Sequence, residues 1–121
     1  MNQPSSYVVV LTGNLATFSQ IQHAAQANGL AVVWGPSFAT TMQKLPPQSS
    51  VAFLIVDLSD DRNECSDVQA TIAHSHPQAK LIAFGPHVHE ARLQKAIDAG
   101  FHQVMARGRF FHVLGELFSG E

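Results

Sequence analysis

The sequence Val51-Ala-Phe-Leu-Ile-Val-Asp57 decides the fold, because six apolar residues in a row end in a carboxylate. A strand that is apolar at every position is typical of a parallel sheet, which is covered on both faces. Neighbouring parallel strands are joined by long crossovers, usually helices. The sequence therefore predicts alternating strands and helices on both sides of residues 51–57.

The rest of the chain shows this alternation. Short apolar runs predict four more strands, and segments with apolar residues on one helical face predict five helices. The strands are expected over residues 7–11, 30–34, 80–84 and 101–106, and the helices over residues 15–27, 38–45, 63–74, 87–99 and 110–118. The strand over residues 101–106 has mixed polarity, which predicts an edge position. We expect a single α/β domain over residues 1–121, doubly wound, with helices on both faces of a parallel sheet.

Composition narrows the classes of function. Charged residues make up 13% of the chain, the net charge is −2, and Lys and Arg form no run. Without a basic stripe there is no electrostatic basis for binding nucleic acid. The N-terminus does not resemble a signal peptide, and no apolar run is long enough to cross a bilayer. We expect a soluble, cytoplasmic protein that binds neither nucleic acid nor membrane and whose low charge favours self-association.

Two local features concern the third predicted helix. Asp61 and Glu64 have the spacing of a capping box. Cys65 is the single cysteine, so it cannot form an intramolecular disulfide. We expect it to be a small buried residue of the helix rather than a reactive thiol.

The carboxyl ends of the strands are where a site is expected, because ligands of doubly wound sheets bind outside those ends. The residues that follow the predicted strands are Thr12, Gly13, Asn14, Trp34, Gly35, Asp57, Gly85, Pro86, Arg107 and Gly108. Asp57 is the acidic member of this set.

The histidines do not predict a metal site. His74 and His76 precede the strand over residues 80–84, whereas His87 and His89 follow it. A strand of that length spans roughly 16 Å, which keeps the two pairs apart.

The chain resembles the receiver domain of bacterial response regulators over its full length, and three stretches carry the resemblance. Phe53-Leu-Ile-Val-Asp57-Leu58 is similar to the family's third strand, which ends in the Asp that accepts a phosphoryl group. Ala96-Ile-Asp-Ala-Gly100-Phe-His-Gln-Val-Met105 resembles its fourth helix, Ala-Gly turn and fifth strand, and Arg107-Gly108-Arg109-Phe110 falls where the family has Lys-Pro-Phe. The resemblance implies a flavodoxin-like sheet with strand order 2-1-3-4-5, and Asp57 as the position of the phospho-acceptor.

Several positions depart from the family pattern, and Ser59 and Asp60 stand where the family has a Met-Pro pair shortly after the acceptor. The two acidic residues that hold Mg²⁺ in the family fall on Thr12 and Gly13, its Ser/Thr falls on Gly85, and its Lys falls on Arg107. Neither Thr12 nor Gly13 supplies a carboxylate to a hard cation, and phosphoryl transfer needs that cation. We therefore interpret the chain as a pseudo-receiver, which keeps the receiver fold without phosphotransfer, and not as an enzyme. We expect no cofactor. Mg²⁺ is expected only if phosphotransfer is retained.

The leading hypothesis is a protein–protein interaction module in signalling. Family receivers commonly use the face formed by the fourth helix, fifth strand and last helix for dimers, so a protein partner or a second copy is expected there. The candidate residues on this face are Phe101, Arg109, Phe110 and Phe111.

Two alternatives stay open. One is an active phospho-acceptor that uses Asp57, with Asp60 or Asp61 as replacement metal ligands. The other is a binder of flavin or nucleotide phosphate at the Thr12–Asn14 turn, with Trp34 and Phe84 stacking on a ring system.

Overall fold

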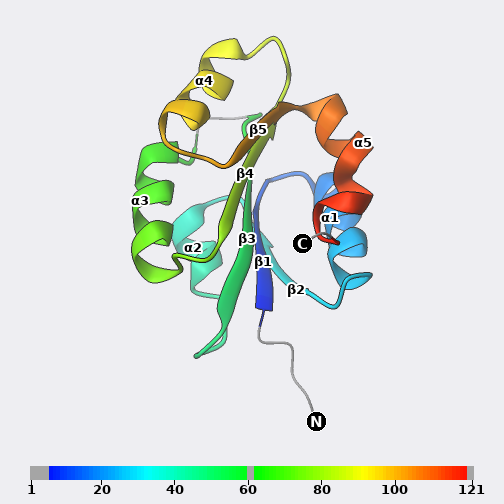
Figure 1. The fold of residues 1–121 in the computed structure, drawn as a ribbon, viewed down its shortest axis with the longest axis vertical. Helices are drawn as coiled ribbons and strands as arrows, with labels where there is room; N and C mark the ends of the chain where they lie inside the picture. The colour runs from blue at the N-terminus through cyan, green and yellow to red at the C-terminus, as the bar shows by residue number, and fades with distance from the viewer. Residues whose placement is uncertain (1–5, 60–61, 120–121) are drawn as a thin grey trace.

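The computed structural model describes residues 6–59 and 62–119 and contains one parallel sheet with the strand order β2-β1-β3-β4-β5 (Figure 1). The strands are β1 (Ser6–Leu11), β2 (Ala31–Gly35), β3 (Ser50–Asp57), β4 (Lys80–Gly85) and β5 (Gln103–Ala106). The helices are α1 (Leu15–Gln26), α2 (Phe38–Met42), α3 (Cys65–Ser75), α4 (Glu90–Asp98) and α5 (Arg107–Leu117). The predicted fold class, strand order and edge position of the fifth strand are confirmed.

Helices cover both faces of the sheet, which explains why β1 and β3 are so apolar. Figure 1 shows α2, α3 and α4 on one face and α1 and α5 on the other. Neighbouring residues of a strand point to opposite faces. Val8 therefore packs in the layer under α1 and α5, and Val9 packs in the layer under α2, α3 and α4.

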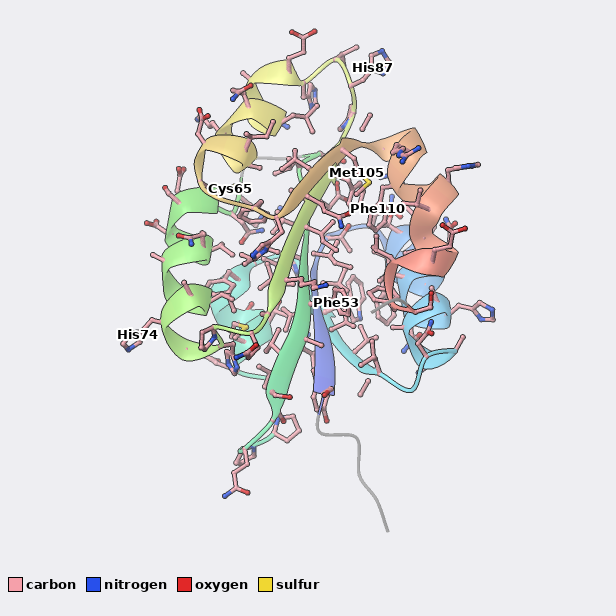
Figure 2. All side chains as sticks on the ribbon, in the orientation of Figure 1. Phe53, Cys65, His74, His87, Met105 and Phe110 are labelled. Carbon is pink, nitrogen blue, oxygen red and sulfur yellow. The ribbon has the colours of Figure 1, made fainter. Side chains whose placement is uncertain are left out.

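Two of the four residues predicted for an interaction face belong to the core, and that part of the prediction is wrong. Phe110 is fully buried and stacks on Phe84, with ring centroids 4.1 Å apart. Figure 2 shows Phe110 on the side of α5 that faces the sheet. Phe101 packs with the layer under α3 and α4. Arg109 is exposed and Phe111 is half-buried, so these two remain at the surface.

The ends of several elements differ from the prediction. Helix α4 begins at Glu90 rather than residue 87, because Pro86–His89 forms a turn in which the His89 N–H donates to the Pro86 carbonyl. Strand β5 begins at Gln103 rather than residue 101, because the Phe101 N–H still donates to Ala96 at the end of α4. Gly100 makes this turn with a φ of 97°, a conformation that favours glycine.

The start of α3 differs as well. Glu64 is the N-cap residue but makes no side-chain cap bond, and its carboxylate accepts from the Ser66 hydroxyl instead. Asp61, the other half of the predicted capping box, lies outside the described residues. Cys65 is buried, as predicted. Burial raises the pKa of its thiol, the Glu64 carboxylate adds to the increase, and the Lys95 ammonium opposes it.

The outer edge of β2 carries a cation. The Lys44 ammonium, just beyond α2, donates to the carbonyl of Trp34 at 2.6 Å. The next carbonyl, that of Gly35, accepts from the Thr12 N–H on the β1 side, so the Trp34 carbonyl points away from the sheet. Lys44 therefore occupies an acceptor on the edge strand.

The histidine pairs lie far apart. Figure 2 shows His74 and His87 at opposite ends of the molecule, separated by the length of β4. In the described part of the chain, no helix is long and apolar enough to span a bilayer.

Candidate functional site

The candidate site lies where β1 and β3 end side by side. The register pairs Leu11 with Val56, so Thr12 and Asp57 follow at neighbouring positions. The Asp57 side chain is largely enclosed, with 8% of the residue exposed. A carboxylate in such a position needs hydrogen-bond donors.

Two hydroxyl groups and one backbone N–H supply those donors. The Thr12 hydroxyl donates to Asp57 Oδ2 at 2.7 Å and accepts from the Asn14 N–H at 3.1 Å. The Ser59 hydroxyl donates to Asp57 Oδ1 at 2.6 Å, and the Ser59 N–H donates to the same oxygen at 3.0 Å. Both carboxylate oxygens therefore accept hydrogen bonds from the chain itself.

Around Asp57, the described residues offer a cation few ligands. No group of three or more His, Cys, Asp or Glu that could hold a metal occurs within residues 6–59 and 62–119. Thr12 uses its hydroxyl as a donor to Asp57, and Gly13 has no side chain. Asp60 and Asp61, the replacement ligands considered from the sequence, lie outside the described residues. Among the described residues around Asp57, the carboxylate available to Mg²⁺ is that of Asp57 itself, and it is already hydrogen-bonded.

Gly85 is fixed by packing against Leu58. A Cβ atom on Gly85 would lie 2.9 Å from the Leu58 Cβ, closer than real Cβ contacts. The Leu58 N–H donates to the Phe84 carbonyl at 2.7 Å, which holds Leu58 in place. A serine or threonine at position 85 therefore does not fit this packing.

Arg107 is held by α1. Its guanidinium donates to the Thr17 hydroxyl at 2.8 Å and lies over the Phe111 ring, 4.9 Å from the centroid. It also contributes to a cavity of about 510 Å³ at the carboxyl ends of the strands, which we call the rim. This rim cavity is lined by Gly13, Asn14, Asp57, Ser59, Arg62, Pro86 and Arg107. Five of the positions that follow the predicted strands thus meet at one cavity: Gly13, Asn14, Asp57, Pro86 and Arg107.

Of the two aromatic residues considered for stacking on a flavin or nucleotide, Phe84 is not accessible to a ligand, so that part of the interpretation is wrong. Phe84 is fully buried under Phe110. Trp34 stacks on Phe18, with ring centroids 4.4 Å apart and planes 11° apart. Asn14 caps α1 by accepting from the Thr17 N–H at 2.9 Å.

Sequence reasoning noted Ser59 only as a departure from the family pattern and missed its bonds to Asp57, and it missed Arg92 altogether. Asp57-Leu58-Ser59 has the spacing at which an aspartate side chain bonds the backbone two residues later, a signal available in the sequence. Arg92, on α4, donates to the carbonyls of Leu58 at 3.2 Å and Ser59 at 2.7 Å. No local pattern predicts that long-range contact.

A second hollow lies along β5 and α5. Its volume is about 570 Å³, and it is lined by His102, Gln103, Val104, Met105, Arg109, Val113, Glu116 and Leu117. Strand β5 ends the sheet, so one of its edges faces this region. Of the four residues predicted for an interaction face, Arg109 lines this hollow.

Comparison with solved structures identifies the fold. The beryllofluoride-activated receiver domain of DrrB from Thermotoga maritima has a TM-score of 0.72 and 10% identity, with 94% of this chain and 93% of that chain covered. The beryllofluoride-activated receiver domain of NtrC4, a dimer, gives 0.69 and 15%, with 93% and 95% covered. HP1043, an orphan response regulator of Helicobacter pylori, gives 0.69 and 12%, with 98% and 94% covered.

The chain thus has the fold of response-regulator receiver domains over nearly its whole length. No protein-family profile matches the sequence, and no curated protein matches it.

Proposed function

We propose that this chain is a receiver-fold signalling module that acts by binding a protein and does not carry out Mg²⁺-dependent phosphoryl transfer. The observation that carries the proposal is the state of Asp57, whose two carboxylate oxygens accept hydrogen bonds from Thr12 and Ser59. The residues that position this carboxylate are hydroxyl donors rather than further carboxylates.

The chemistry of the cation supports this. Mg²⁺ demands octahedral oxygen ligands and gives up its water reluctantly, so it is bound where carboxylates gather. At this rim it would have to displace hydroxyl donors from Asp57. Thr12 and Gly13 add no negative charge in return. Without the cation, the charge that develops on a transferring phosphoryl group is not neutralised.

Intact-mass measurement with acetyl phosphate and Mg²⁺ tests the first half of the proposal. We expect no added phosphoryl group, under conditions in which an authentic receiver domain is modified. A phosphoryl adduct on the wild-type chain that is absent from Asp57→Asn would refute the proposal and favour an active phospho-acceptor.

The partner surface we propose is the hollow along β5 and α5, and the partner is a second copy. Arg109 and Glu116 are exposed, lie seven residues apart on α5 and both line the hollow, with the half-buried Val113 between them. Positions seven apart share one helix face. In a two-fold dimer each Arg109 meets the other copy's Glu116, because the same patch serves both subunits. The dimeric receiver domain of NtrC4 shows that this fold supports dimers.

Sedimentation velocity over a range of concentrations tests this surface. We expect Arg109→Glu or Glu116→Arg to weaken association by about fivefold or more, and the double charge swap to restore it. Lys80→Glu, which reverses an exposed charge at the start of β4, is the matched control. Equal effects of Lys80→Glu and Arg109→Glu, or a strict monomer at high concentration, would show that the partner at this surface is not a second copy.

A further inference from the structure

A cavity between the start of α3 and α4 is separate from the rim cavity and from the β5–α5 hollow. Its volume is about 260 Å³. Leu58, Cys65 and Ala91 contribute its apolar lining, and Leu58 and Cys65 are both buried. A dry apolar cavity of about 150 Å³ is enough to hold benzene. This cavity therefore has room for one small ring together with a polar substituent.

The lining of the cavity carries a net positive charge. Arg92 and Lys95 line it from successive positions on one face of α4, and Glu64 is the acidic residue opposite them. The Arg92 guanidinium is occupied by the carbonyls of Leu58 and Ser59. Within the described part of the chain, the Lys95 ammonium has no hydrogen-bond or ion-pair partner. Lys95 is thus the cation of this cavity that is available to a ligand.

We propose that this cavity binds a small aromatic monocarboxylate, with its ring against Leu58 and Cys65 and its carboxylate at Lys95. Small-molecule sites combine an apolar lining with a few charged or polar groups that fix orientation, as this cavity does. The inference goes beyond the proposed function and does not depend on it, because the ligand contacts neither Asp57 nor the β5–α5 hollow.

Binding here would also reach the rim loop. Leu58 follows Asp57 directly, and Arg92 holds the carbonyls of both Leu58 and Ser59. The Ser59 hydroxyl donates in turn to Asp57. A ligand in this cavity therefore lies against Leu58 and Arg92. These residues are linked through Ser59 to Asp57.

The single cysteine makes the test specific. Benzoate is the probe, and benzyl alcohol, which has the same ring without the charge, is its control. Binding is followed by amide chemical shifts of the full chain, up to about 10 mM ligand, and by the rate at which a small alkylating reagent modifies Cys65. We expect benzoate to shift the amide signals of Leu58, Cys65 and Arg92 and to slow alkylation. Benzyl alcohol should bind about twofold to fivefold more weakly.

Two variants separate this site from general ion effects. Lys95→Gln should weaken benzoate binding about twofold to fivefold, whereas Lys80→Gln, which removes the same charge from an exposed residue on β4, should leave it unchanged. Ala91→Phe, at an exposed helix position, should fill the cavity and abolish binding. Absence of localised shifts at 10 mM benzoate, shifts confined to another surface, or equal effects of Lys95→Gln and Lys80→Gln would overturn the proposal.

Discussion

Replacing Thr12 by valine removes one hydroxyl and keeps almost the same volume, so it isolates the hydrogen bonds of that group. The Thr12 residue is 3% exposed, and its hydroxyl donates to Asp57 at 2.7 Å and accepts from the Asn14 N–H at 3.1 Å. A hydrogen bond to a charged group contributes about 1.5–3 kcal/mol, and a neutral one about 1 kcal/mol. We expect Thr12→Val to lower the free energy of unfolding at pH 7 by about 3 kcal/mol.

Urea denaturation measures this change directly, and thermal denaturation provides a second reading. In a domain of this size a loss of 3 kcal/mol lowers the Tm by about 12 °C. Thr12→Ser keeps the hydroxyl and should lose only about 1 kcal/mol, through its missing methyl group. In an Asp57→Ala background the cost of Thr12→Val should fall to about 1 kcal/mol, because the charged partner is gone. A Thr12→Val variant within 0.5 kcal/mol of wild type, a margin typical of surface substitutions, would refute the account of how the carboxylate is held.

Three further outcomes test other parts of the structure. Gly85→Thr should destabilise the fold by about 1–3 kcal/mol in urea denaturation, and the double variant with Leu58→Ala should lose less than the two single losses added together. Asn14→Ala should cost about 1 kcal/mol by the same assay, because it removes the side-chain cap of α1. Alkylation of Cys65 should reach half its maximal rate at a higher pH than for free cysteine, because burial raises the pKa of the thiol. The same raised pKa favours the folded state below the thiol's unfolded pKa, and this contribution should be lost as the pH rises through the folded value.

The fold was predictable because the apolar runs of the strands indicate a sheet that is covered on both faces. β3 is apolar at every position from Val51 to Val56, and only a strand with helices on both faces requires that. The ends of the elements were harder, because hydrogen bonds decide them. Helix α4 starts three residues later than its pattern suggests, since Pro86 and His89 form a turn that periodicity does not reveal.

The candidate site was predictable in part. Asp57 and Thr12 follow strands that are neighbours in the sheet, so strand order alone brings them together. Arg92 and Asp57 are joined through Ser59 by a contact between α4 and the loop after β3, and sequence spacing does not encode such contacts. Phe110 was misplaced because apolar residues on α5 serve either the core or a surface. Its stacking on Phe84 assigns it to the core.

The ammonium group of Lys44 on the outer carbonyl of Trp34 bears on how copies of this chain can assemble. A sheet with two open edges can add strands at both ends and grow into fibres. Here a lysine obstructs the β2 end, and charge at an edge strand discourages intermolecular pairing. Growth by strand addition is therefore restricted to the β5 end. An assembly that uses β5 from each of two copies leaves two β2 edges, each with a lysine on its Trp34 carbonyl, which disfavours the addition of further strands.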